Sequence, residues 1–61
     1  MEQKKLQELI HWLNVQINYT AMVIDESHNV NIGREIQYEG MHSAFVDLLN
    51  ELTSNNNQAI I

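Results

Sequence analysis

The first half of the chain carries apolar residues on two opposite sides of one expected helix. No proline occurs anywhere, and the first glycine is Gly33, so nothing in the sequence forces an early break. One apolar series recurs at alternating intervals of four and three, with Thr20 filling one place in the repeat: Leu6, Ile10, Leu13, Ile17 and Ile24. This spacing is typical of one side of a helix. We therefore predict a helix over about residues 3–27.

A second apolar series runs along the same predicted helix at intervals of three, four and three: Trp12, Val15, Tyr19 and Met22. At about 100° per residue, its centre lies roughly 160° from the first series. One neighbouring helix cannot cover both sides. A lone hairpin is expected to leave this second series in water, together with part of Val23. We therefore interpret it as an interface for a second copy of the chain or for a different protein, with simple partial exposure of Trp12 and Tyr19 as the remaining alternative.

A second helix is predicted after the segment from Ser27 to Gly33, where Ser, Asn and Gly favour helix ends and turns. Its apolar series is again spaced by threes and fours, and Ala44 and Leu49 widen it: Tyr38, Met41, Phe45, Leu48 and Leu52. We place this helix at about residues 33–54. Its series and the first series of the first helix form the predicted hairpin core, because a short connection makes two helices antiparallel neighbours.

The last residues differ in composition from the two predicted helices. Residues 55–58 are Asn and Gln, whose side chains compete with helix hydrogen bonds, and the chain then ends Ala59, Ile60, Ile61. We expect 1–54 to form the hairpin and 55–61 to be a flexible polar tail, with docking of Ile60 and Ile61 on a partner chain as the alternative. The predicted fold is an all-α antiparallel two-helix hairpin that dimerises into a four-helix bundle.

Length and charge limit what the chain can do. A chain of 61 residues without cysteine has no disulfides to stabilise it, so oligomerisation is the simplest way to bury an apolar content of 44%. The net charge of −5 disfavours direct binding to nucleic acid and to acidic membranes. The sequence has neither the pattern of a signal peptide nor about 20 consecutive apolar residues. We expect a cytoplasmic protein.

Few residues suggest chemistry. Glu39 and His42 form a Glu-x-x-His pattern, which di-iron bundles use together with further inward glutamates. The glutamates of the first helix, Glu8 and Glu26, lie off its aliphatic series, so Glu39 and His42 are only weak candidates for a metal site. No motif for an activated nucleophile or a phosphate loop occurs. We expect no cofactor and no enzymatic activity.

The remaining function classes are non-enzymatic. The first is an oligomeric module that binds another protein or regulates it. The alternative is an acidic inhibitor that mimics nucleic acid on its target, using carboxylates of the second helix and of the turn: Glu35, Glu39, Asp47, Glu51, Asp25 and Glu26. A metal-binding helical bundle is the further alternative. A module should bind its partner in a salt-tolerant way, whereas a mimic should be sensitive to salt.

Overall fold

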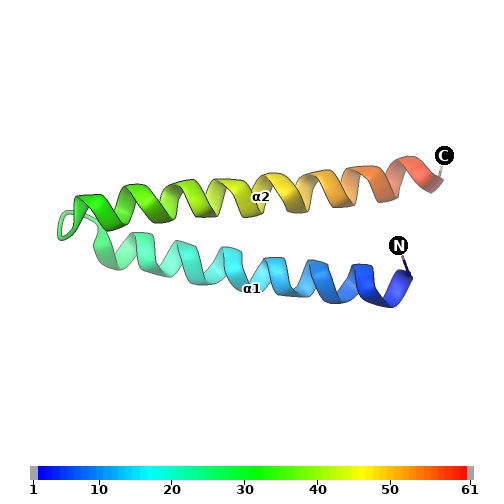
Figure 1. The fold of residues 1–61 in the computed structure, drawn as a ribbon, viewed down its shortest axis with the longest axis horizontal. Coiled ribbons are helices and arrows are strands. Elements are labelled where there is room, and N and C mark those ends of the chain that lie inside the picture. Colours follow the sequence, from blue (N-terminus) through cyan, green and yellow to red (C-terminus); the bar gives the residue numbers. More distant parts are fainter. Residues whose placement is uncertain (1, 61) are drawn as a thin grey trace.

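The protein is an antiparallel hairpin of two long helices. The computed structural model describes the backbone of residues 2–60 and the side chains up to Ser54. Helix α1 spans Gln3–Ser27 and helix α2 spans Ile32–Ile60. The two lie side by side with both termini at the same end, along a long axis of 46 Å (Figure 1). The prediction of an all-α two-helix hairpin is confirmed.

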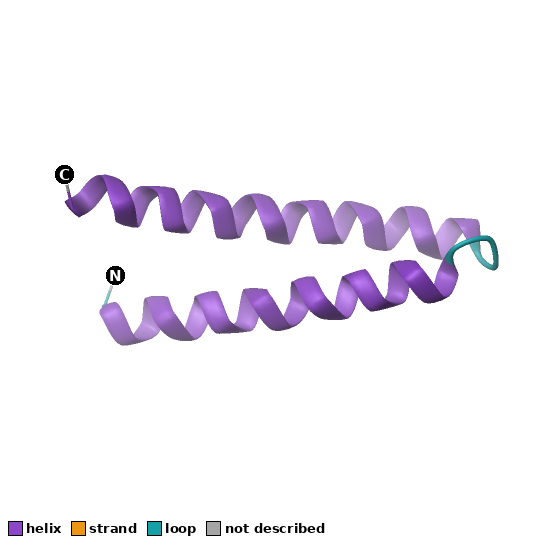
Figure 2. Ribbon diagram, turned by 180° about the vertical axis from the view of Figure 1, so that it is seen from behind, coloured by secondary structure: helices purple, strands orange, loops and turns teal. Residues whose placement is uncertain are grey.

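A tight turn of four residues reverses the chain between the helices (Figure 2). Asn29 has a φ of 64°, in the left-handed region that asparagine tolerates better than most residues. The carbonyl of Ser27 accepts hydrogen bonds from the amides of Val30 and Asn31 at 3.0 and 2.9 Å. The side chain of Asn31 then accepts from the amide of Arg34 at 3.1 Å, which caps the start of α2. The turn thus satisfies backbone groups of both helix ends.

The seam between the helices follows a regular seven-residue repeat on α1. Its fully buried members are Leu13, Thr20, Val23 and Ser27. Half-buried members complete the same three-and-four spacing: Leu6, Leu9 and Gln16. The expectation that Val23 would be partly in water is wrong, since only 2% of this residue is exposed. Ile10, Ile17 and Ile24, which were expected to face α2 directly, each lie one position beyond the seam and are half-buried on its flank.

The seam of α2 follows the same repeat. Its members are half-buried: Glu35, Tyr38, His42, Phe45, Leu49 and Leu52. Met41 and Leu48 were expected in this core, but they lie one position before it and are 36% and 41% exposed. Both corrections have one cause. On α1 the three-and-four spacing fits both Gln16 and Ile17, and on α2 it fits both His42 and Met41. Hydrophobicity favours Ile17 and Met41, whereas the packing of the two helices places the polar Gln16 and His42 in the seam.

Helix α2 continues to Ile60, beyond the expected end at about residue 54. No proline or glycine follows Gly40, so no residue breaks the helix there. The Thr53 hydroxyl donates back to the carbonyls of Leu49 and Asn50, at 3.0 and 3.1 Å, and so stays within the helical pattern. The predicted docking of Ile60 and Ile61 lies outside the described side chains. Neither α1 nor α2 is long and apolar enough to cross a membrane, as judged over the part of the chain that the structure describes.

Candidate protein interface

One side of the hairpin carries a broad apolar surface, which we call the aromatic face. It comprises side chains that are between 36% and 51% exposed: Trp12, Val15, Tyr19 and Met22 of α1, and Met41 and Leu48 of α2. In an antiparallel pair, the positions that precede the seam on each helix lie on the same side. Met41 and Leu48 therefore extend the predicted second series of α1 across the seam onto the other helix.

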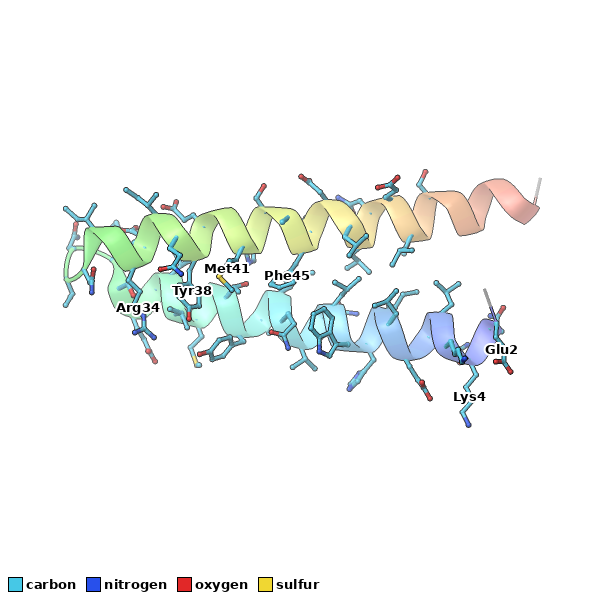
Figure 3. All side chains as sticks on the ribbon, viewed as in Figure 1. Glu2, Lys4, Arg34, Tyr38, Met41 and Phe45 are labelled. Atoms are coloured by element: carbon cyan, nitrogen blue, oxygen red, sulfur yellow. The ribbon has the colours of Figure 1, made fainter. Side chains whose placement is uncertain are left out.

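Contacts across the seam hold the aromatic rings in place. The ring of Trp12 meets the ring of Phe45 edge to face at 5.7 Å, and Tyr19 meets Tyr38 in the same way at 6.3 Å. The Arg34 guanidinium lies over the Tyr38 ring at 5.4 Å. Figure 3 shows Tyr38, Met41 and Phe45 pointing from α2 toward α1. Trp12 and Tyr19, the two rings of the face, therefore pack against rings of the seam and lose little side-chain entropy when a partner covers them.

The α1 side of this face lacks formal charge. Residues 9–24 contain no Asp, Glu, Lys or Arg, although most of the turns in this stretch have a side open to solvent. Interface cores are depleted of charged residues and enriched in Trp, Tyr and Met. The composition of α1 therefore matches an interface better than a solvated helix surface.

The hairpin buries little of its own apolar surface. Among the described side chains, Leu13 and Val23 are the only fully buried apolar ones. A pair of helices with principal extents of 46, 18 and 12 Å buries side chains along its single seam. The aromatic face lies outside this seam and therefore stays partly exposed.

A buried polar pair interrupts the apolar seam near its middle. The Thr20 hydroxyl lies 2.8 Å from the carbonyl of Gln16 and 2.9 Å from Nδ1 of His42. If Thr20 donates to Gln16 and accepts from the Nδ1–H of His42, each of these groups is satisfied. His42, expected to flank the core, therefore lies within it. Its weak candidacy as a metal ligand gains no support, because the described residues contain no group of three or more possible ligands.

The carboxylates of α2 do not line one surface. From Glu35 to Glu51 the helix turns by roughly 160° at about 100° per residue, so Glu39 and Asp47 lie at intermediate angles. Glu35 is half-buried at the seam, whereas Glu39, Asp47 and Glu51 are exposed. Nucleic-acid mimicry requires a dense array of carboxylates on one side. This winding arrangement gives that alternative no support.

The turn carries the most perturbed titratable group that the structure describes. Nδ1 of His28 lies 2.8 Å from a carboxylate oxygen of Glu35, and this hydrogen bond raises the pKa of His28 above its usual value of 6.5. The charge of Glu35 adds to the effect, and the charges of Asp25 and Glu39 add further. Three carboxylates therefore act on one imidazole at this end of the hairpin.

Comparison with protein families, with curated proteins and with solved structures gave no match.

Sequence reasoning missed two features of the exposed surface. Met41 and Leu48 belong to the aromatic face, and the signal that identifies them is the heptad register of an antiparallel pair, in which His42 and Leu49 take the seam positions. The second feature is a group of exposed aliphatic side chains at the turn: Val30, Ile32 and Ile36. Their spacing fits neither apolar series, so a periodicity search does not find them.

Proposed function

We propose that this chain is a non-enzymatic, protein-binding module that works as a homodimer, with the aromatic faces of two hairpins packed together in a four-helix bundle. The observation that carries the proposal is the aromatic face itself: a continuous, partly exposed apolar surface across both helices, next to a stretch of α1 without formal charge. A regulatory role through binding of another protein is the form of activity that such a module offers.

A second copy fits this face for a geometric reason. Dimers with twofold symmetry use the same surface on both chains, so the surface must complement itself. A face made of rings and flexible methionine side chains, without charges that would meet their like, meets this requirement. Covering each half-exposed aromatic side chain contributes about 2 kcal/mol, a large share of the stability of a domain this small.

The test is the mass of the assembly, measured by sedimentation equilibrium or light scattering on wild type, Trp12→Glu and Asn14→Glu. The wild-type chain is expected to have at least twice its 7.1 kDa monomer mass. Trp12→Glu places a charge in the aromatic face and should give a monomer. Asn14→Glu adds the same charge at an exposed position of α1 that is three or four residues from no member of the face, and it should keep the wild-type mass.

Two results would overturn the dimer. One is a wild-type mass of 7.1 kDa at concentrations up to the millimolar range, with full helix content. The other is equal loss of mass in Trp12→Glu and Asn14→Glu, which would assign the effect to net charge instead of the aromatic face.

A further inference from the structure

The turn end of the hairpin exposes a second apolar surface, which we call the aliphatic tip: Val30, Ile32 and Ile36. These residues are 82%, 68% and 63% exposed, the highest values among the large apolar side chains that the structure describes. They lie outside the seam and outside the aromatic face. Together they expose apolar area on the order of a few hundred Å², comparable with the largest apolar patch of a typical monomer, which is often functional.

Acidic side chains surround the aliphatic tip. Ile32, Ile36 and Glu39 share one side of α2, because they are spaced by four and three residues. Asp25 lies in the last turn of α1 and Glu39 about two turns into α2, and the charges of both raise the pKa of His28. His28 pairs directly with Glu35 at 2.8 Å and supplies at most one positive charge among the three carboxylates. The tip is therefore an apolar surface whose neighbouring side chains carry a net negative charge.

Basic side chains are almost absent from this part of the molecule. Residues 25–47 contain acidic residues at five positions, Asp25, Glu26, Glu35, Glu39 and Asp47, against one arginine. That residue, Arg34, is held over the ring of Tyr38, beside the aromatic face. Both lysines, Lys4 and Lys5, lie in the first turn of α1, and the N-terminus of α1 is at the end of the molecule opposite the turn (Figure 1). Arg34 and His28 offset part of the charge of four carboxylates in residues 25–39, so this region stays net negative.

We propose that the aliphatic tip binds an amphipathic helix of another protein that carries lysine or arginine beside its apolar side. This inference deepens the proposed protein-binding function and rests on it. The apolar side of the ligand covers Ile32 and Ile36, and its cations pair with Glu39 and Asp25. Apolar contact supplies the affinity, whereas charge complementarity supplies the choice of partner and the rate of association.

A second copy of the chain does not offer this ligand. The only cations adjacent to each other in its sequence are Lys4 and Lys5. They precede Leu6 and Leu9, and these two apolar side chains are already half-buried in the seam of the same chain. The dimer through the aromatic face involves the middle of the hairpin, so both tips of the dimer stay open. The occupant that fits is therefore a different protein.

The experiment titrates the full-length chain into a fluorescent synthetic helix built of leucine and lysine, and follows anisotropy. A leucine and glutamate helix of the same pattern serves as the ligand control. Ile36→Asn should weaken binding of the lysine helix about tenfold, as expected for loss of an anchor residue. Val15→Asn makes a comparable change on the aromatic face and should leave this affinity unchanged. Glu39→Gln should weaken binding about threefold and reduce its salt dependence, unlike Glu51→Gln at the far end of α2.

The outcomes separate this inference from the dimer. If the monomeric variant Trp12→Glu binds the lysine helix and this binding still requires Ile36, the tip site is supported. If the wild-type chain is monomeric but binds through Ile36, only the dimer is overturned. Equal affinity for the lysine and glutamate helices, or binding lost in Val15→Asn but kept in Ile36→Asn, overturns the tip site. An altered oligomeric mass in Ile36→Asn would show that the tip contacts another copy, and it would also overturn the proposal.

Discussion

Leu13 and Trp12 are neighbours in sequence, yet they belong to surfaces with different roles. Leu13 is fully buried in the seam, whereas Trp12 is 48% exposed although its ring contacts Phe45. The seam obtains its burial from the second helix of the same chain, whereas the side chains of the aromatic face remain 36–51% exposed. The two neighbours thus differ in burial because one faces the second helix and the other faces away from the seam.

The seam is also the more polar of the two surfaces. It contains Thr20, Gln16 and His42, whereas the aromatic face has only apolar and aromatic members. A polar pair in a helical interface fixes register at some expense of stability. The interior of the hairpin is therefore well defined in register but contributes little stability, and the larger apolar surface lies outside the seam. This contrast explains why we place assembly, and not an isolated fold, at the centre of its function.

The largest expected effect comes from placing a charge in the seam. Leu13→Glu should destabilise the chain by about 4 kcal/mol or more, because a carboxylate at a fully buried position has no partner. Helix content measured by circular dichroism should be lost. Trp12→Glu should instead keep most of its helix content at concentrations where the wild type is a dimer. Equal loss of helix in both variants would mean that the two surfaces are not distinct.

Removal of the Thr20 hydroxyl tests the polar layer of the seam. Thr20→Val should cost about 1–2 kcal/mol, since Nδ1 of the half-buried His42 loses its partner. The double variant with His42→Leu should recover most of this loss, because both polar groups are then gone. Urea unfolding of the two single variants and the double variant gives the coupling. Strictly additive effects would show that the two side chains do not interact.

Gly40 provides a position outside both surfaces. It lies in the interior of α2, and a Cβ atom there would contact nothing within 4 Å. Gly40→Ala should therefore stabilise the chain by about 1 kcal/mol through helix propensity alone. Thermal unfolding should shift upward by roughly 4–8 °C, and the oligomeric mass should not change. A lowered unfolding temperature would indicate that another molecule approaches the back of α2.

The smallest effect concerns His28 at the turn. Its pKa is raised above the value of 6.5 by Glu35, so the pair adds stability that is fully present below pH 6.5 and is lost as the pH rises through the folded-state pKa. Wild type should lose slightly more thermal stability than His28→Gln between about pH 5.5 and pH 8.5. Titration of His28 by NMR measures the shift directly. A pKa at or below 6.5 would contradict the pairing.

Much of the fold could be predicted from the sequence, because the absence of proline and the two apolar series dictate long helices around a short polar turn. The register of the seam could not. Gln16 and His42 occupy seam positions beside more apolar neighbours, Ile17 and Met41, so hydrophobicity alone selects the wrong residue. Only the packing geometry of two antiparallel helices, including the bond between Thr20 and His42, distinguishes these alternatives.

The candidate interface was predictable on α1 but not on α2. The second apolar series of α1 lies too far around the helix from the first series to be covered by α2 as well. The structure leaves all of its members partly exposed: Trp12, Val15, Tyr19 and Met22. Met41 and Leu48 join them only once the register of α2 is known. The aliphatic tip could not be predicted, because exposure in a turn depends on how the chain reverses and not on spacing.

The most direct test of the central claim is the fluorescence of Trp12 as a function of concentration. The chain contains a single tryptophan, and it lies within the aromatic face, so its emission reports on that surface alone. If another molecule of the chain covers the face, emission should be at short wavelength at high concentration. It should shift toward that of tryptophan in water on dilution, in step with the loss of dimer mass. Emission typical of water at every concentration, from a helical chain of 7.1 kDa, would contradict it.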